Sequence, residues 1–167
     1  MDTPLEIARK QIEFARGYTH TLLDGVADDE WFRVPEGSVT HLAWQLGHLA
    51  MAQYMLTLFR VRGKQAEDEQ LIPKRFLRKF LKGTTPDSDR EQYPPLEEIR
   101  GTFDGVYARL MSEWESFEQY DLTEQVVEPY AVYGNKLGSL LFAANHEMLH
   151  AGQIGLTRRL LGKQPVR

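Results

Sequence analysis

The sequence contains no cysteine among its 167 residues. This absence excludes disulfide bonds, metal sites built on thiolates and a cysteine nucleophile. No apolar run is long enough to span a bilayer. The N-terminal residues 1–6 have neither the basic nor the apolar region of a secretory signal. We therefore expect a cytoplasmic protein that does not associate with membranes.

An excess of charge of one sign is also missing. The chain has 20 Lys and Arg residues against 24 Asp and Glu residues, for a formal net charge of −4. This balance does not favour a nucleic-acid-binding protein. The length predicts one domain, residues 1–167, with a sizeable core.

Four long segments carry apolar residues at helical spacing, and no convincing strands are present. The expected helices span roughly residues 4–24, 38–62, 94–120 and 137–161, with Thr3 or Asp2 and Ser38 as the first two N-caps. The pattern predicts an all-α fold, a four-helix bundle. The short first connection favours helices 1 and 2 as antiparallel neighbours. The long crossover between helices 2 and 3 allows these two to run in the same direction.

Two connecting segments have patterns of their own. Residues 73–82 combine basic residues with Phe and Leu, which is typical either of a short helix packed on the bundle or of a membrane or nucleic-acid surface. We favour packing on the bundle, because such patterns are weak evidence by themselves. Residues 121–136 are irregular, and Val126–Val127 and Tyr130–Tyr133 are candidates for extended structure.

Two histidines, His146 and His150, lie four positions apart in the middle of the last apolar helix. Residues at this spacing lie one above the other on a helix, so both rings can bind one metal ion. His48, in the middle of the second helix, is the best candidate for a third ligand. Three neutral imidazoles suit Zn(II), Ni(II) or Fe(II) and leave coordination positions open. The alternative is three core histidines that are satisfied by hydrogen bonds.

Several neighbours of these histidines need separate interpretation. His41 lies two turns before His48 and is interpreted as a surface residue or as a support for the ligands. Trp44 is either a wall of the site or ordinary core. Gln153 is a candidate for a hydrogen bond to a ligand or across helices. Glu147 is a candidate catalytic base, although it lies about 100° around the helix from its neighbouring ligand.

The last helix also contains the run His146-Glu147-Met148-Leu149-His150, which matches the H-E-x-x-H signature of zinc metalloproteases. Those enzymes take a third ligand from a position downstream. No His, Glu or Asp follows His150 in this chain, and no strand is predicted that would hold a peptide. The sequence therefore disfavours a protease.

Two motifs are more specific together than apart: Trp44-Gln45-Leu46-Gly47-His48-Leu49-Ala50 and residues 146–154. In both, and in helix order and length along the whole chain, the sequence resembles the DinB-like superfamily of metalloenzymes. The resemblance implies a bundle with an up-down-down-up arrangement and a metal held by His48, His146 and His150. It further implies a homodimer and a transferase that uses a low-molecular-weight thiol and a small-molecule substrate. A metal-dependent hydrolase and a dimeric binding protein with a structural or vestigial metal site are the alternatives.

Overall fold

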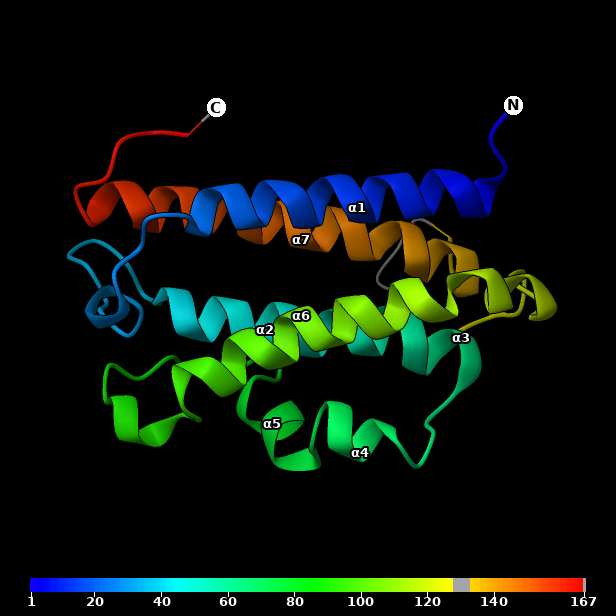
Figure 1. Cartoon of the computed structure of the whole chain (residues 1–167), viewed down its shortest axis with the longest axis horizontal. Helices are drawn as coiled ribbons and strands as arrows, with labels where there is room; N and C mark the ends of the chain where they lie inside the picture. Colours follow the sequence, from blue (N-terminus) through cyan, green and yellow to red (C-terminus); the bar gives the residue numbers. More distant parts are fainter. Residues whose placement is uncertain (128–132, 167) are drawn as a thin grey trace.

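The computed structural model describes residues 1–127 and 133–166, and these residues form an all-α fold (Figure 1). The body of the molecule consists of four long helices: α1 (Pro4–Leu23), α2 (Leu42–Tyr54), α6 (Leu96–Glu113) and α7 (Lys136–Leu160). The described residues contain no strand, only an isolated bridge between Gln125 and Asn135. None of the helices in this part of the chain is long and apolar enough to cross a membrane.

The first helix begins and ends where the sequence predicts. Thr3 is the N-cap, and its side chain accepts a hydrogen bond from the Glu6 N–H while the Glu6 carboxylate accepts one from the Thr3 N–H. Pro4 takes the first helical position, where its missing N–H has no cost. The helix ends at Leu23 with Asp24 as its C-cap, and Gly25 adopts a φ of 68°, a conformation that glycine tolerates best.

The second helix begins later than predicted. Ser38 bonds to Thr40 in a local turn, and His41 is the N-cap instead. The His41 Nδ1 accepts the Trp44 N–H at 3.1 Å, and its Nε2 donates to the Asp87 carbonyl at 2.9 Å. His41 is fully buried, so its interpretation as a surface residue is wrong. Burial lowers the pKa of His41 to about 4, and the ring is therefore a neutral cap.

Beyond Tyr54 the second helix continues through one π-helical turn, η2 (Met55–Phe59), and a last turn, α3 (Arg60–Arg62). The Leu56 carbonyl in the π-helical turn accepts a hydrogen bond from the Ser139 hydroxyl of α7 at 2.7 Å. The helix ends at Gly63, which has a φ of 80°. This end agrees with the sequence prediction.

The long helices form two pairs. α1 packs mainly against α7, and α2 packs mainly against α6 and secondarily against α7. In Figure 1, α1 and α7 run in one direction while α2 and α6 run in the other. The expected common direction of the second and third long helices is therefore observed. The antiparallel directions expected of helices 1 and 2 are also observed (Figure 1), but their packing as neighbours is not, because α1 packs mainly against α7 and α2 mainly against α6.

The crossover packs on the outside of the α2–α6 pair (Figure 1). It contains α4 (Asp68–Leu71), α5 (Lys74–Lys79) and the short η3 (Arg90–Gln92). Phe76 and Phe80 are fully buried, whereas most of the basic side chains between residues 74 and 82 are exposed. This confirms that the amphipathic segment packs on the bundle.

A buried carboxylate ties the crossover to the end of the second helix. Asp68 accepts hydrogen bonds from the Tyr54 hydroxyl at 2.9 Å and from Arg62 at 2.8 Å. Burial by itself raises the pKa of Asp68, but the Arg62 guanidinium, the Gln65 N–H and the Tyr54 hydroxyl outweigh it and lower the pKa to about 2. Asp68 is therefore ionised at neutral pH.

The described residues of the connection between α6 and α7 are largely irregular, as expected. α6 first continues as η4 (Trp114–Gln119), and the chain later forms the bridge at Gln125. The Val126 N–H donates to the Gly134 carbonyl at 3.0 Å, but Val126 and Val127 form no strand. The other expected extended residues, 130–132, lie outside the described residues.

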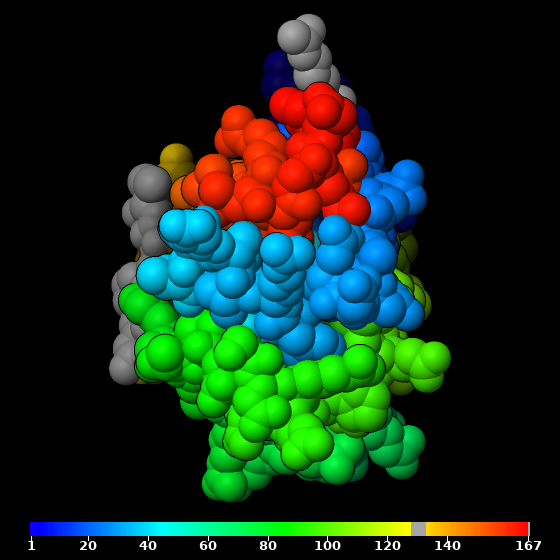
Figure 2. Space-filling view, turned by 90° about the vertical axis from the view of Figure 1, so that its left-hand side faces the viewer, coloured from blue at the N-terminus to red at the C-terminus, as the bar shows by residue number. Residues whose placement is uncertain are grey.

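The connection between α1 and α2 covers the end of the bundle where α1 ends and α2 begins. In Figure 2, residues 24–41 lie between the last turns of α7 and the end of the crossover. The short η1 (Asp28–Glu30) interrupts this segment. Trp31 and Phe32 follow it and anchor the connection in the core, as the two aromatic side chains are buried.

Candidate metal centre

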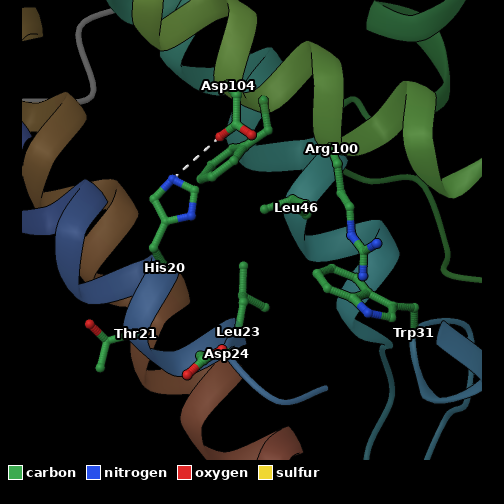
Figure 3. A pocket seen from close by; sticks show the side chains of 9 residues that line it. His20, Thr21, Leu23, Asp24, Trp31, Leu46, Arg100 and Asp104 are labelled. Carbon is green, nitrogen blue, oxygen red and sulfur yellow. Dashed lines mark ion pairs between the residues drawn. The ribbon is translucent and has the colours of Figure 1, made fainter. Parts of the chain in front are cut away.

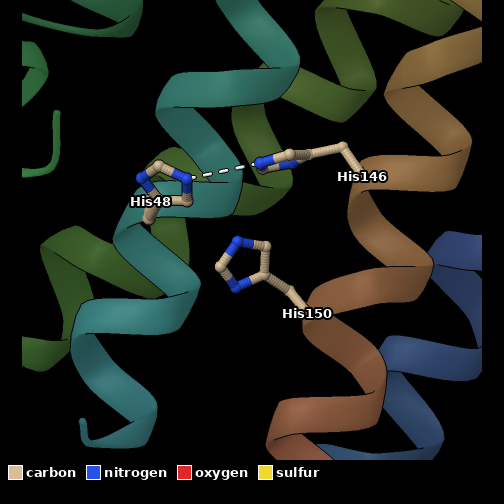
Figure 4. Close-up of side chains that lie close together, drawn as sticks. All are labelled: His48, His146 and His150. Carbon is tan, nitrogen blue, oxygen red and sulfur yellow. Dashed lines mark hydrogen bonds between the residues drawn. The ribbon is translucent and has the colours of Figure 1, made fainter. Parts of the chain in front are cut away.

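Three histidine side chains from two helices point toward one centre (Figure 4). His48 comes from α2, and His146 and His150 come from adjacent turns of α7. One nitrogen from each ring lies within 4.8 Å of the other two. The Nε2 atoms of His48 and His146 lie 3.3 Å apart. The structure thus brings together the three residues that the sequence singles out.

The rings are largely shielded from solvent. His48 and His150 are buried, and His146 is half-buried. Burial lowers the pKa of all three, and together with the neighbouring imidazoles it lowers the pKa to about 4 for His146 and about 3 for His150. The rings are therefore neutral at pH 7, which is the protonation state of a metal ligand.

Two of the rings, those of His48 and His150, form hydrogen bonds through their Nδ1 atoms. The His48 Nδ1 lies 2.8 Å from the Phe80 carbonyl oxygen. A carbonyl can only accept, so this nitrogen carries the proton and the Nε2 of His48 presents its lone pair to the centre. The His150 Nδ1 lies 3.0 Å from the Gln45 Oε1. Such outer hydrogen bonds are typical of metal-bound histidines.

Aromatic packing fixes the position of His48. The Trp44 ring stacks on it with centroids 4.9 Å apart and planes 8° apart. The Trp44 Nε1–H donates to the Thr84 hydroxyl at 3.1 Å. The Phe80 ring covers Gly47, where a Cβ would overlap the ring. Glycine at this position therefore allows Phe80 to approach α2 and place its carbonyl beside His48.

The arrangement fits a divalent metal ion. Two nitrogens bound to one tetrahedral zinc at about 2.0–2.1 Å lie roughly 3.3–3.4 Å apart, because of the tetrahedral angle. The observed His48–His146 separation of 3.3 Å matches this spacing. The group that could hold a metal has three members among the described residues, with no carboxylate in it. A site of this kind leaves at least one position for a ligand from solution.

Glu147 has a different environment from its neighbours His146 and His150. Its carboxylate accepts the Arg16 Nε–H at 3.0 Å, and both side chains are at most 4% exposed. Arg16 also donates to the Gln53 Oε1 at 2.7 Å and to the Phe103 carbonyl at 2.8 Å. This buried network joins α1, α2, α6 and α7. A catalytic role for Glu147 stays a prediction, and the contacts observed are structural.

The other polar candidates do not join the three histidines. Gln153 is exposed on α7, and His41 caps α2. Sequence reasoning missed the contact of Gln45 with His150. Gln45 lies close to one helical turn before His48 on an otherwise apolar helix, and this position indicates that both residues face the same side.

A separate pocket of about 540 Å³ lies between the end of α1 and α6 (Figure 3). Its lining includes His20, whose Nε2 lies 3.3 Å from an Asp104 oxygen. On the other side of the pocket, the Arg100 guanidinium lies 4.5 Å from the Trp31 ring centroid and also pairs with Asp28. The three clustered histidines do not line this pocket.

Comparison with known proteins agrees with this geometry. No curated protein matches the sequence significantly. The family model of the DinB superfamily matches residues 11–154, a range that contains all three histidines and most of the four long helices. The chain belongs to the DinB superfamily.

Proposed function

We propose that this protein is a metal-dependent enzyme that transfers a low-molecular-weight thiol to a small electrophilic substrate. In this proposal His48, His146 and His150 hold a Zn(II), Ni(II) or Fe(II) ion. The observation that carries the proposal is the convergence of three neutral imidazoles with no fourth protein ligand among the described residues.

The number of ligands favours catalysis over a structural role. Structural zinc sites are closed by four protein ligands, whereas catalytic sites use three and keep one position for water or substrate. His146 is half-buried, so part of this ligand's side chain reaches the surface of the protein. A structural metal ion is instead expected in a fully enclosed site, in which protein ligands fill every coordination position.

The composition of the chain supports thiol chemistry. A divalent ion at the site supplies a Lewis acid that lowers the pKa of a thiol or of water. The chain has no cysteine, so no thiol of its own competes for the ion. In the proposed reaction the thiol loses its proton to solvent, the sulfur forms a bond to carbon, and the leaving group departs with the electron pair of the broken bond.

The residues around the histidines have defined tasks in this proposal. Phe80 and Trp44 fix the ring plane of His48 through a hydrogen bond and a stacking contact. The Arg16–Glu147 pair holds the α7 segment that carries the other two rings. Positioning of this kind lowers the cost of organising the site during the reaction.

The test is an assay of the protein loaded separately with Zn(II), Ni(II) and Fe(II). Glutathione, bacillithiol and mycothiol are each offered with a reactive chloroarene or an epoxide, and product formation is followed. We expect conjugation with at least one thiol, lost in His146→Ala and retained in the control His20→Ala. If no thiol reacts, or if His146→Ala keeps the wild-type rate, thiol transfer is refuted. Ester or amide hydrolysis by the same loaded protein would instead support the hydrolase.

A further inference from the structure

Gln45 is a buried polar residue on the side of α2 that faces α7. It has no exposed surface, and its Oε1 lies 3.0 Å from the His150 Nδ1. Its Nε2 is buried and has no hydrogen-bond partner among the described residues. Buried donors almost always have a hydrogen-bond partner, so the amide at this position needs an explanation beyond packing.

We infer that Gln45 is a positioning residue that holds His150 in the tautomer protonated at Nδ1, so that the Nε2 lone pair faces the shared centre. This inference rests on the proposed metal site. It assigns to Gln45 the task that the Phe80 carbonyl performs for His48.

The direction of the hydrogen bond decides whether His150 can bind a metal. When the amide oxygen faces the ring, Nδ1 must carry the proton and Nε2 is free to coordinate. When the amide nitrogen faces the ring, Nδ1 must accept, and the proton moves to Nε2 and blocks coordination there. Only the first orientation agrees with a three-histidine site.

An amide differs from a carboxylate in charge. A glutamate at position 45 would accept the same hydrogen bond and leave no unpaired donor. The glutamine keeps the surroundings of His150 neutral, as the Phe80 carbonyl does for His48. Glu147, the one carboxylate in the sequence of α7, is paired with Arg16. A cation at the centre therefore keeps its full charge for an anionic ligand such as a thiolate.

The first experiment uses the metal-free protein and reads the tautomer directly. Long-range ¹H–¹⁵N correlation spectra of histidine-labelled protein distinguish the protonated ring nitrogen from the one with a lone pair. We expect His150 protonated at Nδ1 in the wild type and in Gln45→Glu, with the Nε2-protonated form increased in Gln45→Leu. Gln53→Leu is the matched control, since it removes a buried amide of the same helix that contacts Arg16. A wild-type His150 protonated at Nε2 would overturn the inference.

The second experiment measures zinc affinity by competition with a chelator. We expect Gln45→Leu to bind zinc about 10–100-fold more weakly than the wild type. Gln45→Glu should bind zinc as tightly as the wild type or more tightly. Wild-type affinity in Gln45→Leu, with the tautomer of His150 unchanged, would refute the role of Gln45. If the wild type shows the expected tautomer but binds no zinc, the proposed function fails and the assignment of the hydrogen bond stands.

Discussion

Replacing Glu147 tests whether this residue stabilises the fold or acts in catalysis. The substitution Glu147→Leu removes the carboxylate that pairs with Arg16 and leaves the guanidinium charge buried. Both side chains are at most 4% exposed, so solvent cannot replace the lost partner. Breaking a buried ion pair by removing one partner costs roughly 3–5 kcal/mol. At roughly 2–4 °C per kcal/mol for a chain of this size, the melting temperature should fall by about 6–20 °C.

The assay is urea unfolding of the single variants Glu147→Leu and Arg16→Met and of the double variant. We expect the double variant to be less destabilised than the sum of the single variants, by about 2 kcal/mol, because the two residues share one interaction. Glu115→Gln is the control, since Glu115 pairs with Arg9 on the exposed surface, and its unfolding midpoint should not change. A loss below about 1 kcal/mol in Glu147→Leu, together with lost activity, would refute the structural role and support a catalytic base.

Three further predictions concern the packing, a buried carboxylate and the surface. Gly47→Ala should lower the free energy of unfolding by about 1–3 kcal/mol, because the new Cβ overlaps the Phe80 ring. Gly152→Ala is the control, since its Cβ meets no neighbour and should not destabilise the protein. Urea unfolding midpoints measure both variants, and equal midpoints would contradict the role of Gly47. The pKa of Asp68 falls from 3.8 to about 2 on folding, so its contribution of about 2 kcal/mol should be complete above about pH 4 and lost as the pH falls toward 2; an Asp68→Asn variant whose stability keeps a constant offset from wild type over this range would refute this. We expect a homodimer whose interface covers the exposed apolar residues Phe14, Leu149 and Leu156 of α1 and α7. The mass from light scattering should then be twice 19.3 kDa, and the mass of a single chain would contradict the dimer.

Local geometry explains which features of the site could be predicted. The spacing of His146 and His150 fixes their relation on any helix, and the apolar surroundings of His48 place it in the core. The N-cap of α1 follows in the same way from Thr3 and its neighbours. These features depend on residues that are close in the sequence, so the sequence specifies them directly.

Contacts between distant segments could not be predicted in the same way. The cap of α2 is His41 rather than Ser38 because the Asp87 carbonyl, in the crossover, provides a partner for the ring. The hydrogen bond between His150 and Gln45 likewise depends on how α2 and α7 pack. The pairing of α1 with α7 decides that Glu147 faces Arg16. In each case the partner lies far away in the chain, and helical periodicity contains no information on it.

The metal content of the purified protein tests the central claim most directly. Metal-free protein is incubated with excess Zn(II) and passed through a desalting column. The number of zinc ions per chain is then measured by inductively coupled plasma mass spectrometry. We predict one zinc per chain in the wild type and in His20→Ala, and a loss of most of the zinc in His48→Ala, His146→Ala and His150→Ala. Equal zinc content in the wild type and in all three site variants, or no zinc in the wild type, would contradict a metal centre formed by these three histidines.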